Sequence, residues 1–509
     1  MGVPVPGTDE LGAIAASFGL SPSDDDLAAY RELVAGSLAA YDTVEDLYQQ
    51  QAPAIPERKS WRPEPAENPL GAWYRRCEVR ERHDGPLEGR RVAIKDNVDV
   101  AGVAMMNGSA TLEGFVPRSD ASVVRRILEA GGEIAGKAVC EDLCFSGGSH
   151  TAATGPVRNP WDPSRSAGGS SCGSAVLVAT RQVDMAIAGD QGGSVRMPAG
   201  WSGVVGIKAT FGLVPYTGAF PIEYTIDNLG PIARTVDDVA LLLTAIAGPD
   251  GMDHRQAGAP SGADYTAGLD RDPADLRIGV VTEGFGHPNS EGAVDHTVRA
   301  AAGRLEAAGA EVREVSIPEH LWAAAVWSVI ATEGAARQML RGNGYGLNHK
   351  GHYNPEIMQA FAEGWRRHGD DVSHSVKFVA LCGQYTLNLL GGSCYAKAQN
   401  LRPLVKAAYD RALDTCDVLC YPTLPMRATP LPAEDCSVSE YVARALEMVP
   451  NTLPSSVTGH PTINVPAGLS DGLPVGMSFV ARYWDETTAL AAAKTYESLV
   501  GGFPSPPAL

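Results

Sequence analysis

The sequence lacks a hydrophobic run long enough to cross a bilayer. Even the apolar stretch at residues 175–188 is interrupted by Arg181 and Asp184. It also lacks the basic segment that opens a secretory signal, because the apolar residues 11–20 follow two acidic residues. These absences predict a cytoplasmic protein that does not bind membranes.

Positive charge is also scarce. Lys and Arg number 41 against 60 Asp and Glu, which gives a formal net charge of −19 at pH 7. A surface of this sign repels a phosphate backbone, and no run of Lys and Arg offsets it. We therefore expect no nucleic-acid partner.

Cysteine is too infrequent for a disulfide framework. The nine cysteines are an odd number spread over 509 residues, which predicts reduced thiols. Cys416 and Cys420 have the spacing of half a metal site, but no second pair of His or Cys lies nearby. Residues 417–421 instead have the apolar pattern of a buried strand, so no metal is expected.

The N-terminal part of the chain has the pattern of a capped helix. After Ser23, a residue type that caps helices, apolar side chains recur at helical spacing: Leu27, Tyr30, Val34, Leu38 and Tyr41. Five prolines between residues 52 and 69 then predict a boundary. We expect an N-terminal helical arm over residues 1–70, suited to dimerisation, and a main domain over residues 71–509.

Strand and helix patterns alternate beyond the arm. Strands are predicted at 92–94, 133–135, 276–281 and 312–317, and helices at 122–130 and 294–308. This alternation predicts an α/β fold with a large mixed β-sheet covered by helices on both faces. Residues 318–400 break the alternation and predict a mainly helical cover, with helices at 321–341 and 356–368.

Two glycine-rich segments carry serines. Residues 167–175 read AGGSSCGSA and residues 190–196 read DQGGSVR, while a strand-like segment before them ends at Lys95. Tight packing alone explains one such segment, and a phosphate-binding loop would need Lys and then Ser or Thr directly after its last Gly. Two serine-bearing segments together with a strand-borne lysine indicate an acyl-transfer site that uses no histidine.

Residues 169–173 also fit the pattern of a nucleophile elbow. In that alternative Ser171 would be the nucleophile of an esterase-like triad, with His460 as the candidate histidine. The pattern is short and often occurs by chance.

Five motifs together resemble the amidase signature family: KDNV at 95–98, GGSS at 168–171, DQGGSVR at 190–196, VTGHP at 457–461 and GLPVG at 472–476. The resemblance runs from about residue 71 to the C-terminus, and the spacings of 75 and 24 residues between Lys95, Ser170 and Ser194 agree with it. Residues 211–223 and the helical arm look most similar to the broad-specificity, enantioselective amidases of nitrile pathways in actinobacteria.

The resemblance implies a Ser-Ser-Lys triad. Ser194 would be the nucleophile, Ser170 the bridging hydroxyl after a cis peptide bond, and Lys95 the base. The chemistry is consistent with these roles, because a serine hydroxyl needs a neighbouring base and burial favours an uncharged amine. The oxyanion hole would consist of the backbone N–H groups of Gln191, Gly192, Gly193 and Ser194.

The resemblance also implies an apolar pocket for the acyl group. Its candidate lining residues are Phe145, Gln191, Ile226, Trp327 and Val449. Ser171 would support the relay, and Asp190 and Arg196 would form a structural ion pair, although a solvated charge explains Arg196 almost equally well. Cys172, where many family members have Gly or Ser, leaves a thiol close to the site. No metal and no organic cofactor are implied.

We therefore expect an amidase that hydrolyses carboxylic acid amides to the acid and ammonia through an acyl-enzyme, with esters or anilides as side substrates. Its expected partner is a small-molecule amide, and the apolar stripe of the arm predicts a homodimer. One alternative is the glutaminase (A) subunit of a tRNA-dependent amidotransferase. Three features argue against it: Gln191 in place of the usual Thr, the acidic net charge and the N-terminal arm. A noncatalytic binding module is disfavoured by three intact reactive positions.

Overall fold

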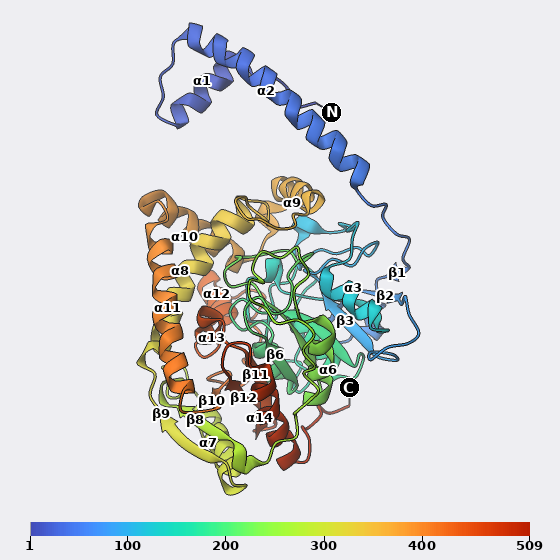
Figure 1. Cartoon of the computed structure of the whole chain (residues 1–509), viewed down its shortest axis with the longest axis vertical. Helices are drawn as coiled ribbons and strands as arrows, with labels where there is room; N and C mark the ends of the chain where they lie inside the picture. The colour runs from blue at the N-terminus through green and yellow to red at the C-terminus, as the bar shows by residue number, and fades with distance from the viewer. Residues whose placement is uncertain (1, 509) are drawn as a thin grey trace. The chain divides into compact units, whose positions relative to one another are not determined.

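The computed structural model describes residues 2–508, and within them a twelve-stranded mixed sheet forms the centre of the main domain (Figure 1). The strands are β1 (Ser60–Trp61), β2 (Trp73–Val79), β3 (Arg91–Lys95), β4 (Glu133–Ala138), β5 (Met185–Gly189), β6 (Val205–Lys208), β7 (Leu229–Ala233), β8 (Arg277–Val281), β9 (Glu311–Val315), β10 (Val418–Pro422), β11 (Thr462–Ser470) and β12 (Leu473–Val480). Their order in the sheet is β1-β2-β4-β3-β5-β7-β6-β11-β12-β10-β8-β9. Strands β4, β3 and β5 are parallel, as are β10, β8 and β9, and the other pairs are antiparallel.

Helices cover both faces of this sheet, which confirms the predicted fold class. They are α3 (Ser122–Glu129), α4 (Cys172–Ala179), α5 (Arg196–Ser202), α6 (Val236–Ile246), α7 (Gly292–Ala307), α8 (Ala323–Ala335), α9 (Pro355–His368), α10 (His374–Leu390), α11 (Ser393–Leu413), α12 (Val438–Leu446), α13 (Leu453–Thr458) and α14 (Glu486–Leu499). Helices α3, α6, α7 and α14 share one apolar cluster with the sheet, and α4 and α5 share another. Within residues 2–508, none of the helices combines the length and the hydrophobicity needed to span a bilayer.

The alternation of side chains along β3 determines which way its last residue points. Val92 and Ile94 belong to the cluster that contains α3 and α6, whereas Ala93 belongs to the cluster that contains α4. Because side chains alternate between the two faces of a strand, Lys95 lies on the same face as Ala93. The last residue of β3 is therefore directed toward the face that α4 covers.

Residues 318–400, where the sequence predicts a helical cover, are mainly helical, and the last helix of this stretch, α11, continues to Leu413. The helix expected over residues 321–341 is divided into a 3₁₀ turn at Pro318–Trp322, the α-helix α8, and a π-helical turn at Ala336–Leu340. Apolar spacing does not distinguish these hydrogen-bonding patterns over a single turn, so the sequence pattern could not mark the divisions.

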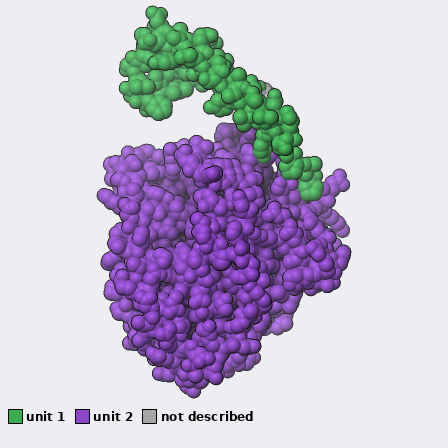
Figure 2. All heavy atoms as spheres, in the orientation of Figure 1, with its two compact units in different colours: residues 1–56 green, residues 57–509 purple. Residues whose placement is uncertain are grey.

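The N-terminal arm is a separate compact unit. The chain divides into Met1–Pro56 and Glu57–Leu509 (Figure 2). The arm contains α1 (Thr8–Ser17) and α2 (Asp24–Gln51), and the Ser23 hydroxyl caps α2 by accepting from the backbone N–H of Asp26 at 3.2 Å. The division comes earlier than the expected boundary near residue 70, because β1 already pairs with β2 of the sheet.

Candidate active site

Lys95 and Ser170 meet at the carboxyl end of β3. The Lys95 amine donates to the Ser170 hydroxyl over an Nζ–Oγ distance of 2.7 Å, and neither side chain is exposed to solvent. Ser170 lies in the loop before α4. Helix α4 covers the face of the sheet toward which Lys95 points. Two residues that lie 75 positions apart in the sequence are thus in direct contact inside the protein.

The Ser170 loop is attached to the end of the neighbouring strand β5. The peptide bond between Gly169 and Ser170 is cis. The next residue, Ser171, donates its hydroxyl to the Gly189 carbonyl at 3.1 Å and accepts from the Gly189 backbone N–H at 3.2 Å. Since β3 and β5 are parallel neighbours, their carboxyl ends lie at the same edge of the sheet. Ser171 therefore holds the Ser170 loop against the segment that leads to Ser194.

A buried ion pair shapes the segment that carries Ser194. The Asp190 carboxylate accepts from Arg196 Nε and Nη2, both at 2.9 Å, and neither side chain is exposed. It also accepts from the backbone N–H groups of Gly193 at 2.8 Å and Val195 at 3.2 Å. Burial opposes ionisation, but the Arg196 charge and these hydrogen bonds outweigh it and lower the pKa of Asp190. Arg196 is thus a buried structural partner rather than a solvated charge.

Two glycines in this segment allow neighbouring side chains to approach its backbone very closely. A Cβ on Gly192 would lie 2.6 Å from the Trp327 ring, and a Cβ on Gly193 would lie 2.4 Å from the Thr452 hydroxyl. Trp327 Nε1 donates to the Gln191 carbonyl at 2.7 Å, and the Thr452 hydroxyl donates to the Gly192 carbonyl. These bonds fix the orientation of consecutive peptide planes beside Ser194.

Of the four backbone amides expected in the oxyanion hole, one is already occupied by a hydrogen bond within the protein. The Gly193 N–H already donates to Asp190. Among the described residues, no acceptor bonds the N–H groups of Gln191, Gly192 or Ser194. Three of the four expected donors are therefore free to bind a ligand.

A narrow, mainly apolar cavity opens beside Ser194. It is lined by all five residues expected in the acyl pocket, namely Phe145, Gln191, Ile226, Trp327 and Val449, and also by Cys144, Ser146, Gly147, Gly192, Met197, Ile222, Ala331 and Leu446. Phe145 and Trp327 lie with their ring centroids 6.4 Å apart. The structure thus brings the candidate pocket and the candidate nucleophile to one place.

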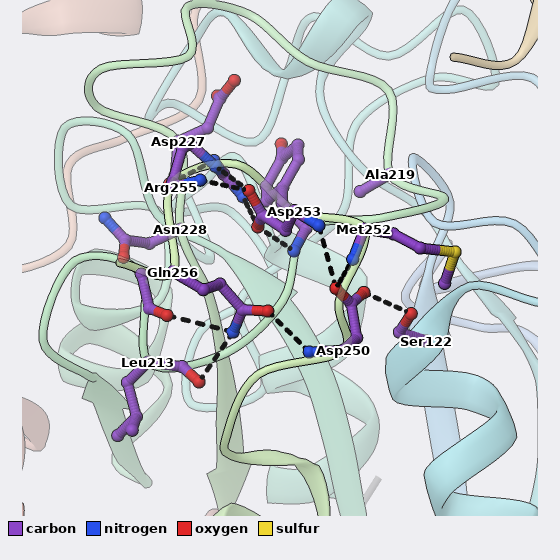
Figure 3. A network of polar contacts seen from close by, with 12 residues as sticks. Ser122, Leu213, Ala219, Asp227, Asn228, Asp250, Met252, Asp253, Arg255 and Gln256 are labelled. Atoms are coloured by element: carbon purple, nitrogen blue, oxygen red, sulfur yellow. Dashed lines mark hydrogen bonds and ion pairs between the residues drawn. The ribbon is translucent and has the colours of Figure 1, made fainter. Parts of the chain in front are cut away.

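A polar network behind the cavity holds Gln191. The Gln191 side-chain amide donates to the Tyr216 hydroxyl at 2.9 Å, and the Arg255 guanidinium lies 4.8 Å from the centre of the Tyr216 ring. Arg255 also pairs with Asp253 through a 2.8 Å bond and donates to the Asp227 carbonyl at 3.0 Å (Figure 3). Burial outweighs the Arg255 charge and raises the pKa of Asp227 to about 8.

This network was not found from the sequence. Its members come from the loops around β7 and from residues 250–256, which carry no recognisable motif. The stretch 211–223 does contain Tyr216, but its contact with Gln191 exists only in the folded chain.

The thiol that lines the cavity is Cys144, not Cys172. Cys172 is fully buried, and its Sγ lies 3.5 Å from the Val139 carbonyl. Cys144 precedes Phe145 and follows Leu143, and both Leu143 and Cys144 have positive φ, at 46° and 59°. Adjacency to Phe145 was the only signal in the sequence that could have identified Cys144.

The structure gives no support to the elbow-type triad. Both ring nitrogens of His460 are engaged elsewhere, Nδ1 with the Thr458 hydroxyl at 2.8 Å and Nε2 with Asp410 at 3.0 Å. Ser171 bonds the backbone of Gly189 instead. Residues 418–422 form the expected buried strand β10, and no cluster of metal-binding side chains occurs in the part of the chain that the structure describes.

Comparison with known proteins identifies the family. The Amidase family profile matches residues 63–490. The chain is 49% identical over 505 residues to an enantioselective amidase of Rhodococcus rhodochrous, across 99% of this chain and 97% of that protein. It is 38% identical over 434 residues to the glutamyl-tRNA(Gln) amidotransferase (A) subunit of Exiguobacterium sibiricum, across 84% of this chain and 88% of that protein.

A solved structure agrees with this result. The peptide amidase of Stenotrophomonas maltophilia matches the fold with a TM-score of 0.68 and 31% sequence identity, across 83% of this chain and 85% of that one. The family match covers strands β2 to β12 of the sheet, the Lys95–Ser170 contact and the segment that carries Ser194. The chain therefore belongs to the amidase family.

Proposed function

We propose that this protein hydrolyses carboxylic acid amides to the acid and ammonia through an acyl-enzyme on Ser194. The observation that carries the proposal is the 2.7 Å contact between buried Lys95 and Ser170, and Ser194 itself lines the apolar cavity. A lysine amine with a serine hydroxyl as its close neighbour can activate a second serine without a histidine.

The proposed reaction begins with a proton relay. Uncharged Lys95 takes the Ser170 proton, while Ser170 takes the proton of Ser194 as the Ser194 oxygen attacks the amide carbon. The relay then returns a proton to the leaving nitrogen, and ammonia departs. Water enters by the same route, is deprotonated by the relay, and cleaves the acyl-enzyme to release the acid.

The backbone amides beside Ser194 supply the oxyanion hole in this proposal. The free N–H groups are those of Gln191, Gly192 and Ser194, and the Trp327 and Thr452 bonds hold the intervening peptide planes in place. Because these donors are already fixed before the reaction, they need no reorganisation when negative charge develops on the substrate oxygen. Asp190 contributes by ordering the segment through the Gly193 and Val195 amides.

The apolar cavity sets the substrate class. Aromatic and aliphatic side chains make up most of its lining, so a small aliphatic or aromatic acyl group would bury its apolar surface there. The nine cysteines are all free thiols, which suits a reducing compartment, and we take the cytosol as the proposed location.

The sharpest test of the proposed function is hydrolysis by the purified chain alone. We expect ammonia release from benzamide or propionamide without any partner protein, because the cavity and the relay lie within this one chain. A glutaminase subunit of an amidotransferase would instead require its partner subunits and prefer glutamine. Ammonia from glutamine only, and only in a reconstituted complex, would contradict the proposal.

We also propose that the protein is a homodimer held through its N-terminal arm. Helix α2 has no buried residue, and large apolar side chains on it are exposed, including Leu33 at 67% and Leu47 at 57%. These two residues lie 14 positions apart, which places them on one face of the helix, a different face from that of the stripe Leu27, Tyr30, Val34, Leu38 and Tyr41. A second copy of the arm would cover this face.

Sedimentation analysis tests the dimer. We expect the mass of two chains at micromolar concentration, and a single-chain mass for the double variant Leu33→Glu, Leu47→Glu, because charged side chains resist burial at an interface. Leu33 and Leu47 are already exposed within the single chain, so these substitutions should not unfold it. A single-chain mass for the unaltered protein would refute the proposal.

A further inference from the structure

Cys144 is a nucleophilic side chain that the proposed mechanism does not use. It lines the same cavity as Ser194, and the Lys95 amine and the Ser170 hydroxyl lie near enough to lower the pKa of its thiol. Its Sγ also donates to the Asn107 side-chain carbonyl at 3.2 Å. The thiol therefore lies where a molecule in the cavity would meet both the relay and a sulfur atom.

The surroundings of Cys144 favour its reactive form. Burial opposes loss of the thiol proton, but hydrogen bonding with Cys140 and the charge of Lys95 in its protonated form outweigh burial and lower the pKa of Cys144 to about 7. The thiolate is the nucleophilic form of cysteine. Burial has the opposite result at Cys172, where it raises the pKa well above its ordinary value. Cys144 is thus the more reactive of the two thiols near Ser170.

One polar residue of the cavity lining, Gln191, has a side-chain atom that lacks a partner. Gln191 is 3% exposed, and its Oε1 atom has no hydrogen-bond donor among the residues that the structure describes. An amide N–H in the cavity would supply this missing donor and relieve the cost of leaving a buried acceptor unpaired. The remaining lining is mainly apolar, which admits a neutral amide and penalises a carboxylate.

We propose that Cys144 is a modification site for small amides that carry an electrophilic carbon next to the carbonyl, such as α-haloamides. This inference rests on the proposed function in one respect: the amide group of the reagent binds where the amide of a substrate would bind. In the modification the Cys144 sulfur forms a bond to the α-carbon, the carbon–halogen bond breaks, and the halide leaves with the electron pair. The thiol proton goes to solvent. The thioether then occupies the cavity beside Lys95 and Ser170 and blocks hydrolysis.

Iodoacetamide tests the proposal on the intact protein at pH 7. The alkylated cysteines are mapped by peptide mass spectrometry while amide hydrolysis is followed in parallel. We expect alkylation of Cys144 and loss of activity at the same rate, with benzamide slowing both. We also compare the ratio of the alkylation rate with iodoacetamide to the rate with iodoacetate at two cysteines. We expect this ratio to be about tenfold or more higher at Cys144 than at half-exposed Cys436, because the carboxylate must leave water to enter the cavity.

Variants separate this inference from the proposed hydrolysis. Ser194→Ala keeps the cavity and the thiol, so we expect Cys144 in that variant to be alkylated, with protection by benzamide, although turnover is lost. Any turnover that remains in Cys144→Ala should resist iodoacetamide, whereas Cys436→Ser should be inactivated like the unaltered protein.

Three results would overturn the inference. They are alkylation of Cys144 no faster than that of Cys172, alkylation that benzamide does not slow, and inactivation of Cys144→Ala at the rate of the unaltered protein. The labelling of Ser194→Ala decides the question even if Cys144→Ala has no turnover.

Discussion

Replacing Ser194 by alanine is expected to lower kcat/KM for benzamide by roughly 10⁴- to 10⁶-fold, since it removes the nucleophile on which the acyl-enzyme forms. The cavity and the Lys95–Ser170 contact should survive, because the substitution removes one oxygen atom of a residue that is only 5% exposed. A fluorophosphonate should add its phosphonyl mass to the unaltered protein and leave Ser194→Ala unmodified. Steady-state kinetics and intact mass spectrometry measure the two effects.

Ser171→Ala is the matched control for that experiment. Ser171 is the neighbour of the bridging serine, and among residues 2–508 its hydroxyl bonds only the Gly189 backbone. We expect a smaller loss of turnover and continued labelling by the fluorophosphonate. The reverse pattern, in which Ser171→Ala abolishes labelling and Ser194→Ala does not, would establish the elbow-type nucleophile instead.

Lys95→Ala is expected to lower turnover at neutral pH by about 10³- to 10⁴-fold, because it removes the base that takes the proton from Ser170. The measurement is kcat at pH 7, together with thermal unfolding to show that the variant is folded. Lys95→Arg should be similarly inactive, because a guanidinium keeps the positive charge but does not give up its proton. Near-normal turnover of either variant would show that Lys95 is not the base.

Lys208 provides a control for the loss of a buried amine. It lies on β6, is not exposed, and donates to the Ala209 carbonyl at 3.0 Å. Burial, together with the nearby Arg196 charge, lowers the pKa of Lys208 to about 7. Lys208→Met should therefore change stability more than chemistry, with kcat of the folded fraction within about tenfold of the unaltered protein. A loss of kcat in Lys208→Met as large as that in Lys95→Ala would mean that turnover depends on buried positive charge in general and not on Lys95 acting as a base.

The fold class followed from the sequence because local patterns report it directly. Alternating apolar residues predicted β3, β8 and β9, and helical spacing predicted α3, α7 and α9 close to their observed bounds. The order of twelve strands in the sheet did not follow, since it depends on contacts between segments far apart in the chain. The same holds for β1, whose pairing with β2 moved the division between arm and main domain to Pro56.

At the site, the sequence determined which residues carry the chemistry, because the motifs around Lys95, Ser170 and Ser194 are local and resemble a family. It could not determine which amides stay free, since the Gly193 N–H is taken by Asp190 only when the turn closes. Nor could it choose between thiols. Cys172 is adjacent to the Ser170 loop in the chain, yet its Sγ faces backbone.

The sequence by itself therefore determined the α/β class, the family resemblance and the identity of the reactive side chains, all of which depend on neighbouring residues. Only the tertiary structure decided that Cys144 lines the cavity, that Gln191 bonds Tyr216, and that Arg255 packs on the Tyr216 ring. The physical reason is that side-chain direction and burial arise from packing between distant segments, and packing of that kind leaves no local pattern in the chain.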